Sequence, residues 1–229
     1  MSTGISVVGL DADDTLWENE TFFRLTQDRF AELLKDHVDG DHLMDRLLEA
    51  ETRNIGHYGF GIKGFVLSMI ETALDVTGDR VPASVIRELV NAGQEMLQHP
   101  VRLLPHAAEV VDELSAHHEL VLITKGDLLH QEQKIARSGL GDQFDRVEIV
   151  STKTVSTYQR IFGSQTEAAM MVGDSMASDV RPALSAGAWG VFVPTGRAWA
   201  LEAADPPEDP SRYFEICDLG ELPGVIRQI

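Results

Sequence analysis

The chain has 229 residues, of which 43% are hydrophobic and 24% charged, as expected for an ordinary soluble globular protein and not for a disordered one. Its net charge of -18 disfavours nucleic acid and anionic membranes as partners. The N-terminus lacks the pattern of a signal peptide and no apolar run is long enough to span a membrane, so we expect a cytoplasmic protein. The single cysteine, Cys217, has apolar neighbours, which predict a packed thiol.

Short apolar runs alternate with helical patterns through most of the chain. This alternation is typical of an α/β fold in which helices connect the strands of a mostly parallel sheet. A short closing helix is expected over 219–229, and 194–212 reads as a surface loop because it is rich in proline and acidic residues. The expected strands, in chain order, are 5–10, 119–124, 146–150, 168–172, 189–193 and 213–216.

Residues 19–100 interrupt this alternation. They contain no convincing strand but carry the apolar spacing of four amphipathic helices. Gly78 is expected to end the third helix and Pro82 to begin the fourth. We therefore predict a catalytic core formed by 1–18 and 101–229, with a four-helix insertion over 19–100.

Polar residues follow four of the expected strands where each strand ends. The carboxyl ends of parallel strands share one edge of the sheet, where ligands bind, so these residues are expected to meet in one crevice. They are Asp11 and Asp13 after the first strand, Thr124, Lys125 and Gly126 after the second, Lys153 after the third, and Asp174, Ser175 and Asp179 after the fourth.

Three carboxylates within residues 11–14 repel one another unless a cation neutralises them, which indicates a metal. Mg2+ prefers oxygen ligands, and Asp11, Asp174 and a backbone carbonyl can supply them. Beside a cation, the Asp11 carboxylate can approach a phosphate as a nucleophile and form an aspartyl-phosphate. Asp13 can protonate the leaving oxygen and then deprotonate water.

The remaining candidates have supporting roles. Thr124 and the nearby backbone N–H groups of Lys125 and Gly126 can bind phosphoryl oxygens, while Lys153 can offset the charge shared by Asp11 and the phosphate. Asp179 is expected to orient Lys153 or a metal-bound water. Ser175 is expected beside the metal ligands without a chemical task of its own.

These segments resemble, in order, the four motifs of the haloacid dehalogenase-like hydrolases. The matching segments are Asp11-Ala12-Asp13-Asp14-Thr15, Thr124, Lys153 and Gly173-Asp174-Ser175-Met176-Ala177-Ser178-Asp179. The resemblance implies a Rossmann-like core, Mg2+ bound by Asp11, the Asp13 carbonyl and Asp174, and a helical cap at 19–100. It also implies that Asp11 is the nucleophile and Asp13 the acid and base.

Two positions refine what the resemblance implies. Dehalogenating members lack the second aspartate of the first motif, so Asp13 favours a phosphate substrate. Lys125 stands where many relatives carry asparagine, which alters the rim of the phosphate pocket. In the insertion, the glycine-rich stretch 58–64 is either an ordinary connection or a loop that brings Lys63 to the leaving group of the substrate.

The sequence thus predicts a Mg2+-dependent phosphatase whose partner is a small phosphorylated metabolite. One alternative is a phosphoglucomutase-like intramolecular phosphoryl transferase, which would use the same Asp11 and Asp13. Another is a noncatalytic phospho-receiver or binding module, since receivers also place Thr and Lys around a phosphorylatable Asp. The long insertion and Asp13 weigh against a receiver.

Overall fold

The computed structural model describes residues 4–196 and 199–229, and the chain divides into two compact units. The first, which we call the core, contains Met1–Glu20, Val101–Lys125 and Gln131–Ile229. The second, the helical unit, contains Thr21–Pro100 together with Gly126–His130.

The core is built on a six-stranded sheet in the order β3-β2-β1-β4-β5-β6, and every neighbouring pair of strands is parallel. The predicted parallel α/β core is therefore confirmed, with strand ends that differ from the expected ones by one or two residues. The strands are β1 (Val7–Leu10), β2 (Glu119–Lys125), β3 (Arg146–Val150), β4 (Ala169–Gly173), β5 (Trp189–Phe192) and β6 (Tyr213–Glu215).

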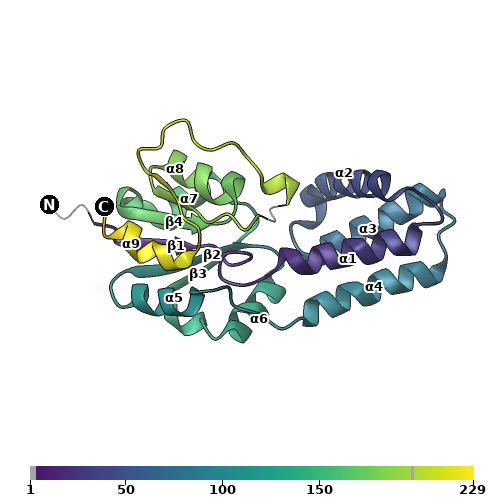
Figure 1. The fold of residues 1–229 in the computed structure, drawn as a ribbon, viewed down its shortest axis with the longest axis horizontal. Coiled ribbons are helices and arrows are strands. Elements are labelled where there is room, and N and C mark those ends of the chain that lie inside the picture. Colours follow the sequence, from purple (N-terminus) through teal and green to yellow (C-terminus); the bar gives the residue numbers. More distant parts are fainter. Residues whose placement is uncertain (1–3, 197–198) are drawn as a thin grey trace. The chain divides into compact units, whose positions relative to one another are not determined.

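Helices cover both faces of this sheet, as expected from strands with few polar side chains (Figure 1). Alternate residues of a strand point to opposite faces. Val8 and Leu10 accordingly pack with the side chains of α5 (Ala107–Ser115) and α9 (Leu222–Ile226). Val7 instead packs with those of α7 (Val155–Phe162) and α8 (Arg181–Ala186).

The described part of the core also contains one further long helix and five short helical turns. The long helix is α6 (Leu128–Ser138), whose first three residues belong to the helical unit. The short ones are η1 (Gly141–Gln143), η2 (Gly163–Ala168), η3 (Met176–Val180), η4 (Ala200–Glu202) and η5 (Leu219–Glu221).

The helical unit has its own apolar interior. Gly78 adopts a left-handed conformation with φ 59° and ends α3, and Pro82 precedes α4, as the sequence predicts. Phe30, Leu43 and Met69 are almost completely buried in this interior. The helices are α1 (Glu20–Leu34, whose first residue belongs to the core), α2 (Gly40–Tyr58), α3 (Ile62–Thr77) and α4 (Ala83–Gln98).

Two expectations from the sequence need correction. Cys217 is exposed and not packed, because Ile216, the residue that directly follows β6, takes the buried position next to it. The segment 194–212 is not purely a surface loop, since η4 brings Glu202 into polar contact with the end of the sheet. Residues 197–198 of this segment lie outside the described residues. Within the described ranges, no helix combines the length and apolar character needed to cross a membrane.

Candidate active site

The ends of two neighbouring strands bring Asp11 and Asp174 together. β1 pairs directly with β4, with Leu10 opposite Val172, and each aspartate follows its strand almost at once. The Asp11 N–H donates to the carbonyl of Val172 over 2.9 Å. The hydroxyl of Thr15 donates to Asp11 Oδ2 over 3.2 Å and accepts the N–H of Asp174 over 3.1 Å. The first and fourth motifs are thus fixed to each other by backbone and side-chain hydrogen bonds.

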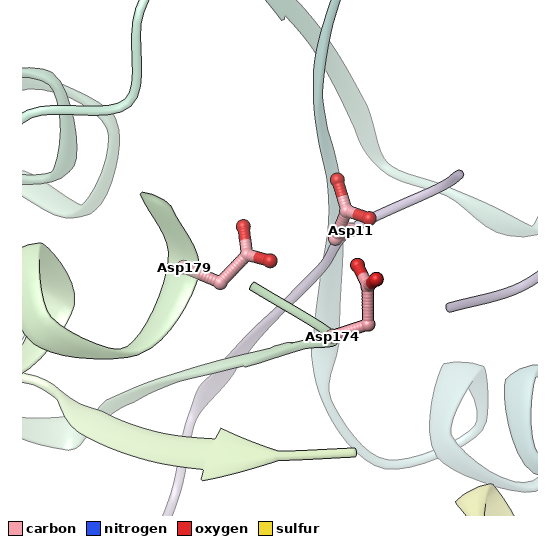
Figure 2. Close-up of side chains that lie close together, drawn as sticks. All are labelled: Asp11, Asp174 and Asp179. Atoms are coloured by element: carbon pink, nitrogen blue, oxygen red, sulfur yellow. The ribbon is translucent and has the colours of Figure 1, made fainter. Parts of the chain in front are cut away.

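Three carboxylates face one another at this edge (Figure 2). One oxygen each from Asp11, Asp174 and Asp179 lies within 4.8 Å of the others. Among the residues that the structure describes, the Asp174 carboxylate has no hydrogen-bond or ion-pair partner. A half-buried carboxylate without a partner is costly unless a cation binds it. The oxygen donors therefore suit a hard divalent cation such as Mg2+.

The pKa values of these carboxylates also favour a bound cation. Burial raises the pKa of Asp11 to about 7, and the neighbouring Asp179 contributes to that rise while Lys153 opposes it. Burial, with Asp11 nearby, raises the pKa of Asp174 well above its usual range. A bound cation would reverse both shifts, because it stabilises the ionised forms.

Lys153 bridges the nucleophile candidate and Asp179. Its buried ammonium donates to Asp11 Oδ1 and, over 2.6 Å, to Asp179 Oδ1. Although burial opposes the charged form, these two carboxylates raise the pKa of Lys153 well above its usual value. Gly173 makes the arrangement possible, since a Cβ there would lie 2.2 Å from Asp179 Oδ2. Asp179 thus contacts Lys153, one of the two partners expected for it, and its supporting role stays a prediction.

Three side-chain donors hold the carboxylate of Asp13. Trp17 Nε1 donates to Oδ1 over 2.6 Å, Lys134 Nζ donates to the same oxygen over 2.5 Å, and Gln131 Nε2 donates to Oδ2 over 3.1 Å. Burial would raise the pKa of Asp13, but Lys134 and the hydrogen bonds outweigh it and lower that pKa. Trp17 thus helps to orient this carboxylate.

Gln131 connects Asp13 to the second motif. Its amide nitrogen lies 2.6 Å from Thr124 Oγ1 and 2.8 Å from the carbonyl oxygen of Lys125, so its two protons are shared between these acceptors and Asp13 Oδ2. Since the Thr124 oxygen accepts from Gln131, the hydroxyl proton must point elsewhere, and its contact with the Lys125 carbonyl is a long 3.3 Å. Thr124 therefore keeps a proton that it can donate to a ligand.

Lys125 and Ser175 meet through Glu202. The Lys125 ammonium pairs with the Glu202 carboxylate and donates to Ser178 Oγ over 2.7 Å. The hydroxyls of Ser175 and Ser178 both donate to Glu202 Oε2. Burial alone would raise the pKa of Glu202, but the ion pair with Lys125 and these hydrogen bonds lower it.

Two predicted residues belong to the helical unit. Lys63 pairs with Asp127 over 2.8 Å and is exposed, so its expected contact with a leaving group stays a prediction. Gly126 directly follows β2 with φ 127°, a conformation that favours glycine.

Three residues at the core site were missed by sequence reasoning. Gln131 and Lys134 lie three positions apart on α6, and a pair of buried polar side chains on one helix face is the signal that could have drawn attention to them. Glu202 lies in a segment of proline and acidic residues, where no motif or periodicity distinguishes one carboxylate from another.

The comparisons with known proteins place this geometry in a family. The model of haloacid dehalogenase-like hydrolases matches residues 5–187. A haloacid dehalogenase-like family hydrolase from Xanthomonas campestris has a structure similar to this chain, with 40% identity, a TM-score of 0.86, and coverage of 98% of this chain and 91% of that one. No curated protein is similar enough to match.

Two more distant structures share the fold alone. A HAD hydrolase, YfnB from Bacillus subtilis, described as bound to magnesium, is 16% identical, with a TM-score of 0.65 over 98% of this chain and 99% of its own. An L-2-haloacid dehalogenase from Xanthobacter autotrophicus, with chloropropionic acid covalently bound, is 19% identical, with a TM-score of 0.67 over the same shares. The motifs, the Rossmann-like fold and the matched family model together establish that this chain belongs to the haloacid dehalogenase-like hydrolases.

Proposed function

We propose that this hydrolase is a Mg2+-dependent phosphatase that cleaves a small phosphomonoester through an aspartyl-phosphate on Asp11. The observation that carries the proposal is the Asp174 carboxylate, which faces Asp11 without a partner among the described residues. Asp11, Asp174 and the carbonyl of Asp13 would hold the cation. When bound, Mg2+ would neutralise these carboxylates and polarise the phosphoryl group.

In the first step an Asp11 oxygen attacks phosphorus, and the bond between phosphorus and the ester oxygen breaks. The Lys153 ammonium already contacts Asp11 and is held there by Asp179, so it can offset the charge that gathers between nucleophile and phosphate. The proton of the Thr124 hydroxyl is available to a phosphoryl oxygen. Asp13 donates a proton to the departing alkoxide, and the arrival of a phosphate dianion beside it favours the proton uptake that this requires.

In the second step Asp13, now ionised, removes a proton from water. The hydroxide formed attacks the aspartyl-phosphate, which releases inorganic phosphate and restores the Asp11 carboxylate. The Lys134 ion pair favours the ionised form of Asp13 that this step needs. Trp17 and Gln131 keep the carboxylate in a fixed orientation between the two steps.

A haloacid substrate is the main competing possibility, because one similar structure is a dehalogenase. Halide leaves as a stable anion, so displacement of halide from carbon needs neither a proton donor at Asp13 nor a metal beside Asp11. This chain has both a hydrogen-bonded carboxylate at Asp13 and an oxygen-donor set at Asp11 and Asp174. These features favour phosphate as the group transferred.

We further propose that 19–100 acts as the cap of the enzyme and contributes to its selectivity. The four helices form a compact unit with an apolar interior of its own, which suits a body that moves as a whole. In this proposal Lys63 exchanges its exposed ion pair with Asp127 for a contact with the leaving group of the substrate.

The experiment that tests the proposal measures two products from the same enzyme. Sugar phosphates, nucleotides and small phosphorylated acids are assayed for release of inorganic phosphate, and 2-chloropropionate is assayed for release of chloride, each with Mg2+ and with EDTA. We expect Mg2+-dependent phosphate release and no chloride. Chloride release that EDTA leaves unchanged would contradict the proposal and favour a dehalogenase.

A further inference from the structure

One carboxylate in the core occupies a set of donors that would suit a ligand. The ammonium of Lys125 and the hydroxyls of Ser175 and Ser178 all bind the carboxylate of Glu202. The side chains of Lys125 and Glu202 are only 13% and 17% exposed. We call Lys125, Ser175 and Ser178 the anion cradle.

The order of the strands places the anion cradle next to the proposed reaction site. Lys125 ends β2, whereas Ser178 follows β4, and β1 lies between these two strands. The contact between Lys125 and Ser178 therefore passes over the end of β1, which is the strand that Asp11 follows. Lys125 also directly follows Thr124, and Ser175 directly follows Asp174. A substrate whose phosphate reaches Asp11 would thus have the cradle beside it.

The chemistry of the cradle is that of an anion site. An ammonium and two hydroxyls offer several donors to one carboxylate, and hydrogen bonds to charged groups are the strong ones. The donors and acceptors of this network are compatible with one another. Ser178 Oγ accepts from Lys125, and Ser175 Oγ accepts from the Ser178 N–H. Each hydroxyl then donates its own proton to Glu202. The backbone and Lys125 thus orient both hydroxyl protons toward the occupant.

Glu202 reaches the cradle from outside the motif segments. It lies in η4, in the segment between β5 and β6, whereas the cradle residues lie at the ends of β2 and β4. A side chain that is not built into these strands can leave the donors while the donors stay in place.

We propose that the anion cradle binds a second anionic group of the substrate, a carboxylate or a second phosphate, and that Glu202 is an internal competitor for this subsite. The inference rests on the proposed phosphatase activity and narrows its substrate to a phosphomonoester that carries another negative charge. A substrate with that charge displaces Glu202, whereas one without it leaves Glu202 in the cradle.

The test compares 3-phosphoglycerate with glycerol 3-phosphate, two esters that differ by a carboxylate in place of a hydroxymethyl group. For each enzyme the ratio of their kcat/KM values gives the preference for the acidic substrate. Glu202→Gln removes the competing charge at nearly constant shape, so we expect this preference to rise about tenfold. Lys125→Met removes the ammonium, so we expect the preference to fall below that of the wild type. Glu208→Gln, an exposed position of the same segment, is the matched control and should leave the preference unchanged.

Calorimetric binding of the same two esters to the Asp11→Asn variant separates the cradle from turnover. If no enzyme releases phosphate but Glu202→Gln still strengthens binding of 3-phosphoglycerate alone, the phosphatase proposal fails and the cradle stands. If Glu202→Gln weakens both esters equally, or changes neither, Glu202 only fastens its segment to the core and the inference is wrong.

Discussion

The edge of the core that carries the proposed active site and the helical unit differ in the side chains that they bury. At the edge, Lys153 and Asp179 are fully buried and paired, with Asp11 beside them. In the helical unit the interior is mainly apolar, around residues such as Phe30 and Met69, with a few buried polar side chains such as Asn54. The ion pair between Arg29 and Glu88 lies at its surface. Stability in the helical unit therefore comes from apolar burial, whereas the core carries buried charges that oppose folding unless they remain paired.

This difference predicts which substitutions should lower activity and stability most. A charge removed from the catalytic edge leaves a buried partner uncompensated and also removes a reacting group. A charge removed from the surface of the helical unit leaves its partner in water, where a pair contributes only about 0–1 kcal/mol. Substitution of Lys153 in the core and of Lys63 in the helical unit therefore compares the two regions directly.

The largest effect is expected for Asp11→Asn. The amide is neutral and a poor nucleophile, so turnover should fall on the order of 10⁴-fold or more, as it does when a residue that forms the covalent intermediate is lost. Steady-state phosphate release measures this effect. Asp112→Asn, at an exposed position of α5, removes the same charge and should retain full activity. Turnover that survives Asp11→Asn would exclude Asp11 as the nucleophile.

The core fold could be predicted from the sequence because local patterns of residues determine its strands and helices. Apolar strands separated by helical patterns predicted the parallel sheet, and Gly78 and Pro82 predicted two helix boundaries. Polar residues at strand ends predicted that Asp11, Asp174, Lys153 and Asp179 would meet. Their segments occur in the same order as the four motifs of the family, which supported that prediction. These features depend on residue type and spacing alone.

The rest of the site depends on contacts between distant segments, which no local pattern encodes. Nothing in the sequence indicates that Lys134 pairs with Asp13 or that Glu202 reaches Lys125, because the direction of each side chain is set by how α6 and η4 meet the sheet. Cys217 follows the end of β6, and its apolar neighbours do not indicate that Ile216 is buried while Cys217 is exposed.

Asp13→Asn is expected to have the next largest effect. General acid and base catalysis is worth about 10²–10⁴-fold, so kcat should fall by that order. The affinity for Mg2+ should change little, because the carbonyl of Asp13 and not its carboxylate is the proposed ligand. Single-turnover kinetics and a Mg2+ titration measure the two effects separately. An unchanged kcat would remove Asp13 from its role.

Lys153→Met compared with Lys63→Met tests the contrast in stability. Loss of the Lys153 ammonium leaves Asp11 and Asp179 facing each other in a buried site, and we expect the free energy of unfolding to fall by about 3–5 kcal/mol. Lys63 makes an exposed pair with Asp127, so its loss should cost less than about 1 kcal/mol. Urea denaturation measures both values. Equal losses would mean that burial of the Lys153 pair has little influence on its contribution.

A smaller effect is expected from pH in the metal-free protein. Burial raises the folded-state pKa of Asp11 from 3.8 to about 7, so between these values the folded state binds more protons than the unfolded chain. The free energy of unfolding should therefore fall as pH rises through this range. Mg2+ stabilises the ionised carboxylates, so its effect on Tm should be larger at about pH 8 than at about pH 5. Thermal denaturation with and without Mg2+ measures this difference, and the opposite order would contradict the assignment of Asp11 as a metal ligand.

The most direct test of the account is to find where the phosphoryl group is bound during turnover. The enzyme is mixed with Mg2+ and a substrate that it hydrolyses, quenched in acid within one turnover, and digested for mass spectrometry. The account predicts the mass of one phosphoryl group on Asp11, absent when EDTA replaces Mg2+ and absent from Asp11→Asn. A phosphoryl group on any other residue, or full turnover with none on the protein, would contradict it.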